Sequence, residues 1–171
     1  MSQFKFGAPA ALSRDAFVET FGAIYEHSPW IAERTYDKGL TEEHSSIETL
    51  QAAMATVFLA ASKDEQLGVI IAHPDLAGRA ARAGNLTAES TNEQASAGID
   101  TLTDEEYAEF TELNDAYKAR FNFPFIMAVK GSNKHAILAG FKERIHNSPE
   151  QEFTRALTEI NKIAGFRLAD M

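Results

Sequence analysis

Apolar side chains recur along most of this chain at the three- and four-residue spacing of amphipathic helices. Serine, threonine and aspartate precede these runs at positions that suit helix caps. The predicted helices are Ser13 to before Pro29, Ser28–Gly39, Ser45–Phe58, Asp64–His73, Ser90–Gly98, Thr103–Phe121, 133–147 and 149–165. Because no other segment alternates convincingly as a strand, we predict an all-α protein in which seven or eight helices form a single bundle-like domain over residues 1–171.

Local sequence patterns define the starts of some helices and indicate which segments between helices are not helical. The predicted capping boxes pair Ser45 with Glu48 and Thr103 with Glu106. Residues 74–87 contain two glycines and are predicted to be mostly irregular. The apolar run 123–129 breaks the helical period, and a lone strand would have no partner. We therefore interpret 123–129 as an extended or kinked buried segment.

Composition narrows the class of protein. The 171 residues, 44% hydrophobic and 24% charged, suit one domain. Cysteine is absent, which excludes disulfides, thiolate metal sites and thiol nucleophiles and fits a reducing compartment. The net charge of −9, without a cluster of basic residues, argues against nucleic-acid binding.

Nothing in the sequence indicates a membrane segment or a targeting signal. The apolar runs are too short to span a bilayer. The first residues, MSQFKFGAPAAL, lack the features of a secretion signal, and the last residues, LADM, are not a peroxisomal address. We expect a cytoplasmic protein that does not bind membranes.

His73 is the first candidate for chemistry. A residue before proline is pushed toward extended geometry, so His73 is expected where a helix gives way to a loop. Imidazole titrates near neutral pH and can give or take a proton during turnover. Taken alone, however, the motif favours an ordinary helix-end histidine bound to nearby carbonyls.

The stretch Ser90–Gln94 is the second candidate. Ser90 and Glu93 have capping-box spacing, and on spacing alone this structural role is favoured. The functional alternative is that Glu93 orients a histidine while Ser90 and Asn92 hold a polar ligand.

Two further candidates lie toward the C-terminus. The segment 122–131 is either part of the core or a pocket wall whose backbone groups face a flat ligand. Arg167 either snorkels to solvent or binds a carboxylate with its planar guanidinium. His73 and Asp75 could ligate a metal, but the remaining histidines are scattered and no second ligand pair has suitable spacing.

Taken together, several short stretches resemble the OHCU decarboxylase family, whose substrate is 2-oxo-4-hydroxy-4-carboxy-5-ureidoimidazoline. The matching stretches are Tyr25-Glu26-His27-Ser28-Pro29-Trp30, Ala72-His73-Pro74-Asp75-Leu76-Ala77-Gly78, Ser90-Thr91-Asn92-Glu93-Gln94-Ala95-Ser96-Ala97-Gly98, Leu113-Asn114-x-x-Tyr117, Phe121-x-Phe123-Pro124-Phe125-Ile126 and Arg167-Leu168. Their order and spacing are highly specific, and the resemblance runs from about Ala16 to Leu168.

The resemblance implies an all-α decarboxylase that needs neither metal nor organic cofactor and forms (S)-allantoin, often as a homodimer. The implied catalytic residues are His73, Glu93 and Arg167. The implied substrate-binding residues are Pro74, Ser90, Thr91, Asn92, Glu93, Gln94, Phe125, Ile126, Met127, Ala128, Val129 and Arg167. This resemblance reverses the structural preference for His73 and Glu93. A metal-assisted ureide hydrolase and a non-enzymatic helical interaction module remain the alternatives.

Overall fold

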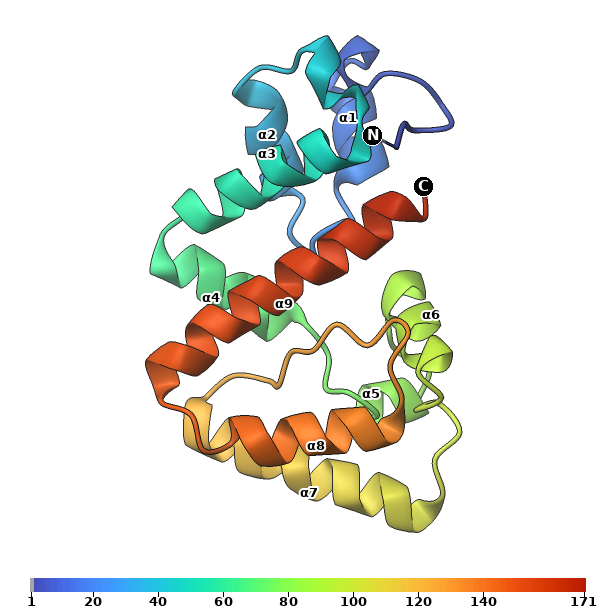
Figure 1. Ribbon diagram of the computed structural model, residues 1–171, viewed down its shortest axis with the longest axis vertical. Coiled ribbons are helices and arrows are strands. Elements are labelled where there is room, and N and C mark those ends of the chain that lie inside the picture. The colour runs from blue at the N-terminus through green and yellow to red at the C-terminus, as the bar shows by residue number, and fades with distance from the viewer. Residues whose placement is uncertain (1) are drawn as a thin grey trace. The chain divides into compact units, whose positions relative to one another are not determined.

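The computed structural model describes residues 2–171 and contains nine α-helices and no β-strand in that range (Figure 1). The α-helices are α1 Arg14–Phe21, α2 Trp30–Asp37, α3 Ile47–Ala60, α4 Lys63–Ala72, α5 Arg79–Arg82, α6 Ala88–Ser96, α7 Asp104–Phe121, α8 Lys134–Arg144 and α9 Pro149–Ala169. Two 3-10 helices, Pro9–Ala11 and Glu42–Ser45, precede α1 and α3. The predicted all-α class is confirmed, with the very short α5 accounting for the additional helix.

The helices group into two compact units. Unit 1 consists of Met1–Ala72 and Asn161–Met171, and unit 2 consists of His73–Ile160. The division falls at the end of α4 and within α9. No helix among the described residues combines the length and the apolarity that crossing a membrane requires.

Several predicted boundaries are confirmed. Ser13 caps α1 by accepting a hydrogen bond from the Ala16 amide. Thr103 and Glu106 form the predicted reciprocal capping box at the start of α7. α4 ends at Ala72, because the residue before Pro74 is disfavoured in helical conformation.

The first helix is shorter than predicted. α1 ends at Phe21 instead of continuing to the residues before Pro29, and His27 has a φ of 48° that no α-helix can accommodate. The physical reason is tertiary: the carbonyl groups of Ala23 and Ile24 accept hydrogen bonds from the Arg167 guanidinium. These bonds satisfy backbone groups that a longer helix would otherwise have paired.

The predicted capping box of Ser45 with Glu48 is wrong, and so is the alternative that Ser90 caps its helix. Ser46 caps α3, because the residue before it is already part of the 3-10 helix Glu42–Ser45. Thr87 caps α6 and accepts from the Ser90 amide, so Ser90 lies inside the first turn and does not cap it. The stretch predicted to be mostly irregular, residues 74–87, also contains the short helix α5.

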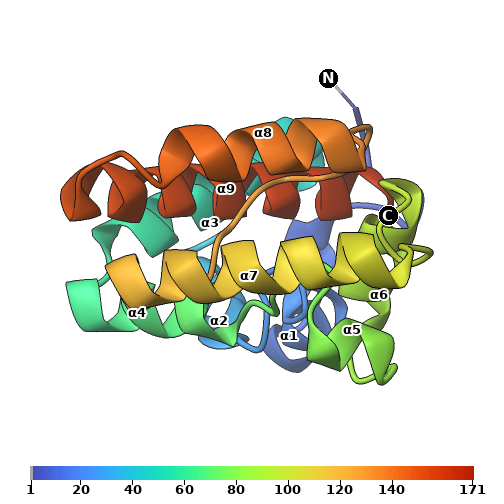
Figure 2. The same cartoon turned by 90° about the horizontal axis from the view of Figure 1, so that it is seen from below.

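Unit 2 is arranged around the connection between α7 and α8. Figures 1 and 2 show that this connection runs back along α7, so that α8 begins beside the start of α7 and the two helices run parallel. Residues 124–129 in this connection have no regular secondary structure and are buried or half-buried. The prediction of an extended buried segment is therefore confirmed.

Candidate active site

His73 is the first residue after α4 and is only 8% exposed. The following proline has no backbone N–H to donate, so the chain leaves the helix at this point and enters the loop 73–78. A histidine at a helix end would normally be free to move with its loop. Here the loop is fixed by side chains from two other helices of unit 2.

α6 fixes the loop through Gln94. The Oε1 atom of Gln94 accepts a hydrogen bond from the Ala77 amide at 2.8 Å, and its Nε2 atom donates to the Asp75 carbonyl at 3.4 Å. Ala77 has a φ of 52°, a left-handed conformation that residues with a Cβ rarely adopt. The buried amide of Gln94 therefore helps to hold a backbone geometry that the local sequence does not favour.

α7 fixes the same loop from a second helix. Asn114 Nδ2 donates to the Leu76 carbonyl at 2.9 Å, and Lys118 Nζ pairs with Asp75 Oδ2 at 2.6 Å. A Cβ atom added to Gly78 would lie 2.6 Å from the Cβ of Asp75, so this turn requires glycine for its close approach. Side chains of α6 and α7 thus hold the loop after His73 at three successive residues, Asp75, Leu76 and Ala77.

The five residues Ser90–Gln94 occupy the first turns of α6. Ser90 and Gln94 are buried on one helical face, since residues four apart share a face. Thr91 and Asn92 are exposed, and Glu93 is half-buried. One helix cannot turn all five side chains toward the same point, so any ligand contacts from Thr91 and Asn92 come from a different face than those of Ser90.

A cavity of about 210 Å³ in unit 2 is lined in part by residues of this helix. Its lining consists of Ala77, Ala81, Arg82, Gly84, Leu86, Thr91, Gln94, Ile99, Asp100, Leu102 and Tyr107. Of the predicted site residues it includes only Thr91 and Gln94, and neither His73 nor 125–129 lines it.

The segment Phe125–Val129 is braced by buried side chains in place of a neighbouring strand. Arg144 Nη1 donates to the Ile126 carbonyl at 2.5 Å, and Glu159 Oε1 accepts from the Ala128 amide at 3.3 Å. The Phe125 ring stacks on Phe141 with centroids 3.9 Å apart. These contacts provide hydrogen-bond partners for one carbonyl and one amide of the extended backbone and hold the Phe125 ring in place.

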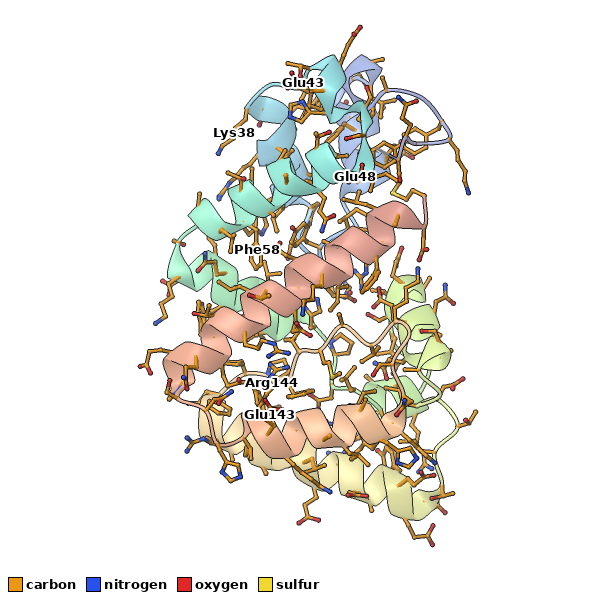
Figure 3. All side chains as sticks on the ribbon, in the orientation of Figure 1. Lys38, Glu43, Glu48, Phe58, Glu143 and Arg144 are labelled. Atoms are coloured by element: carbon orange, nitrogen blue, oxygen red, sulfur yellow. The ribbon has the colours of Figure 1, made fainter. Side chains whose placement is uncertain are left out.

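The brace continues into a buried polar cluster. Arg144 projects from α8 into the interior of unit 2 (Figure 3), where its Nε donates to Glu152 Oε1 at 2.8 Å. Tyr117 donates its hydroxyl to the same oxygen at 2.6 Å, and Asn147 donates to Glu152 Oε2 at 2.9 Å. Burial, reinforced by the contact with Glu152, raises the pKa of Tyr117 far above its usual range, so its hydroxyl stays protonated and acts as a donor.

Sequence reasoning did not identify this cluster as part of a site. A signal was present: Arg144 follows Ile137 and Phe141 at the spacing of the buried face of α8, where a charged residue requires a partner. The partner itself, Glu152, could not be identified from spacing.

Arg167 lies in unit 1, whereas all the other predicted site residues lie in unit 2. Its Nη2 donates to Glu26 Oε2 at 2.8 Å, and its Nη1 donates to the carbonyls of Ala23 and Ile24, each at 3.3 Å. The Arg167 and Glu26 side chains are 5% and 1% exposed, so the alternative of an arginine that snorkels to solvent is wrong. Sequence reasoning missed Glu26 as the partner, although it lies in one of the matching motifs.

The geometry around His73 and Asp75 does not favour the alternative of a metal site. Within residues 2–171, no three His, Asp or Glu side chains gather in an arrangement that could hold a metal ion. The carboxylate of Asp75 is paired with Lys118 instead.

The chain is similar to known proteins over nearly its full length. The model of the family described as OHCU decarboxylase matches residues 10–169. A 2-oxo-4-hydroxy-4-carboxy-5-ureidoimidazoline decarboxylase from Haloferax volcanii is 44% identical over 159 residues, which cover 93% of this chain and 90% of that protein. The uric acid degradation bifunctional protein PucL from Bacillus subtilis is 39% identical over 160 residues, covering 94% of this chain but only 31% of that longer protein.

A solved structure shares the arrangement of helices. The crystal structure of an (S)-allantoin synthase is similar with a TM-score of 0.75 and 34% identity, covering 95% of this chain and 52% of that one. The chain thus spans about half the length of that synthase.

Proposed function

This chain belongs to the OHCU decarboxylase family, and on that premise we propose that it decarboxylates 2-oxo-4-hydroxy-4-carboxy-5-ureidoimidazoline to (S)-allantoin, as part of urate degradation. The observation that carries the proposal is the family match over residues 10–169, which includes every candidate site residue. The buried imidazole of His73, on a loop pinned by α6 and α7, supplies a fixed proton-transfer group.

The substrate itself lowers the demand on the protein. Its carboxylate and hydroxyl share one ring carbon beside a C=N group, so the electron pair left by departing CO₂ can be taken up by the adjacent unsaturation. No external electron sink is then required. The remaining tasks are to position the substrate, to stabilise charge and to deliver a proton to one face of the ring.

We assign these tasks to the candidate residues. His73 engages the hydroxyl and delivers the proton, with Glu93 as its orienting carboxylate, since a neighbouring negative charge favours the protonated imidazole. Arg167 binds the anionic substrate; its bonds to Glu26 and two carbonyls hold the guanidinium in one orientation. The substrate-binding groups are Pro74, Ser90, Thr91, Asn92, Gln94 and the segment Phe125–Val129.

The test is circular dichroism of freshly generated urate-oxidation intermediates with and without the protein. Spontaneous decay gives racemic allantoin, so optical activity should rise much faster with the wild-type protein. His73→Ala is expected to abolish this gain while the far-ultraviolet spectrum stays helical. His135→Ala, at an exposed histidine on α8, is the matched control and should retain the wild-type rate. Formation of (S)-allantoin at the normal rate by His73→Ala would remove His73 from the mechanism.

Glu93→Gln separates orientation from proton transfer. The amide keeps the shape of the side chain but removes its charge, so we expect a lower rate and a shifted pH profile. An unchanged pH profile would exclude Glu93 from acid–base catalysis.

We further propose that the protein acts as a cytoplasmic homodimer, which the family resemblance supports. Light scattering coupled to size exclusion distinguishes a particle of twice the chain mass from a monomer.

A further inference from the structure

One face of α7 connects two segments of the proposed site. Asn114 and Tyr117 are three residues apart, so they share a face of the helix, and both side chains are buried. Asn114 donates to the Leu76 carbonyl in the loop that begins at His73. Tyr117 donates to Glu152, and Glu152 is bonded to Arg144, which in turn donates to a carbonyl in the segment 125–129.

The connection from Tyr117 to that segment has two further links. Glu152 Oε1 accepts from both the Tyr117 hydroxyl, at 2.6 Å, and Arg144 Nε, at 2.8 Å. Arg144 then donates from Nη1 to the Ile126 carbonyl at 2.5 Å, and its guanidinium lies 4.3 Å from the centroid of the Phe125 ring. One guanidinium therefore fixes both a backbone carbonyl and a neighbouring ring.

Stability alone is a weak reason for this arrangement. The Glu152 and Arg144 side chains are 0% and 3% exposed, and well-packed apolar residues are often as stabilising as a buried ion pair. Arg144 Nη2 and Asn114 Oδ1 also have no hydrogen-bond partner among the described residues, which adds a cost. A polar cluster that is costly to bury but directional is suited to fixing geometry.

We propose that Asn114, Tyr117 and Arg144 are positioning residues. In this proposal α7 is a common frame: through these side chains it fixes the position of the His73 loop relative to the substrate-binding segment 125–129. This role rests on the proposed function. Asn114 acts on the loop that carries the proton-transfer group, whereas Tyr117 and Arg144 act on the segment that binds substrate. The frame therefore has two arms, the contact of Asn114 and the contacts of Tyr117 and Arg144. The first should affect the chemical step and the second should affect substrate binding.

Two variants test the two arms. Tyr117→Phe keeps the ring and removes the hydroxyl bond to Glu152, and we expect it to raise KM about three- to tenfold with a smaller change in kcat. Asn114→Leu keeps the branched shape of the side chain and removes the bond to the Leu76 carbonyl, and we expect it to lower kcat about three- to tenfold with a smaller change in KM. A role in stability alone would not divide the two kinetic constants in this way.

Hydrogen exchange provides a readout besides activity. Amides in the peptide covering 124–129 should exchange faster in Tyr117→Phe, and amides in the peptide covering 73–78 should exchange faster in Asn114→Leu. Tyr36→Phe is the matched control, because it removes a partly buried tyrosine hydroxyl bond, to the Leu12 carbonyl, in unit 1. It should change neither peptide and neither kinetic constant.

The outcomes separate this proposal from the proposed function. A wild-type protein that forms no (S)-allantoin refutes the function, and the positioning role with it. An active wild type with both kinetic constants unchanged in Tyr117→Phe and Asn114→Leu refutes the positioning role alone. Should Tyr117→Phe fail to fold, Arg144→Lys replaces it: the charge is kept but the planar fork is lost, and the same rise in KM is expected.

Discussion

Replacing Arg144 by methionine should strongly destabilise the protein. The change removes the guanidinium that pairs with Glu152, bonds the Ile126 carbonyl and lies over the Phe125 ring. Methionine fills most of the space with a flexible apolar chain, so the loss is mainly electrostatic rather than a cavity. Tyr117 and Asn147 still donate to Glu152, but both are neutral and leave its charge uncompensated.

The magnitude follows from the burial of both partners. Removing one member of a buried ion pair typically costs about 3–5 kcal/mol, because the other charge remains without compensation. Glu152 is 0% exposed and cannot recover its hydration without local unfolding. We therefore expect Arg144→Met to lower the free energy of unfolding by about 3–5 kcal/mol, which for a chain of this size lowers Tm by roughly 6–20 °C.

Urea unfolding measures this free energy. Trp30 is the only tryptophan of the chain and lies in unit 1, so its fluorescence and the helical circular dichroism monitor different parts of the protein. Their transitions must coincide for a single free energy to be defined. Arg120→Met, on α7, is the control: its guanidinium donates to the Asn147 carbonyl at an exposed position, and we expect a loss of less than about 1 kcal/mol.

The difference in unfolding free energy between Arg144→Met and Arg120→Met tests whether the charge of Glu152 is buried and depends on Arg144. A loss below about 1 kcal/mol for Arg144→Met, equal to that of Arg120→Met, would mean that Glu152 is hydrated or already neutral in the folded protein. The polar cluster could then not be the rigid brace that the geometry indicates.

Two further predictions concern the loop and the surface. Gly78→Ala places a Cβ 2.6 Å from the Cβ of Asp75 and should cost about 1–3 kcal/mol in urea unfolding, whereas Gly68→Ala, at an open position on α4, should gain roughly 0.5–1 kcal/mol; equal effects would contradict the close approach. The bonds from Arg34 lower the pKa of Glu65 from 4.5 to about 2, so this carboxylate stabilises the fold above pH 4.5 and loses that effect as the pH falls toward 2. The difference in Tm between wild type and Glu65→Gln should shrink over that range, and a difference that grows would reverse the sign of the linkage.

Local patterns explain why most of the helices could be predicted. Ser13 and Thr103 cap α1 and α7 because a side-chain oxygen needs only the amide three residues later. The segment 124–129 was correctly interpreted because proline and the loss of helical period are also local features. The motifs around His73 and Glu93 carried the resemblance to the family that the full-length comparison then established.

Predictions failed where another group or element competed with the expected local pairing. The first helix stops at Phe21 because Arg167, 144 residues after Ala23, takes up the carbonyls that follow. Serine at 45 has the spacing of a cap, but the preceding 3-10 helix moves the start of α3 so that Ser46 takes that position. Such outcomes depend on which elements meet, and spacing does not contain that information.

The sequence by itself determined the helical class, most helix starts and the residues on which a family assignment depends, because caps, periodicity and motifs act over a few neighbouring positions. Only the tertiary structure decided how those residues are held: the bond of Gln94 to the Ala77 amide, the pairing of Glu26 with Arg167, and the cluster around Glu152. The physical reason is that a buried polar group must find a partner wherever the fold brings one, and a linear pattern records the need for that partner but not its identity.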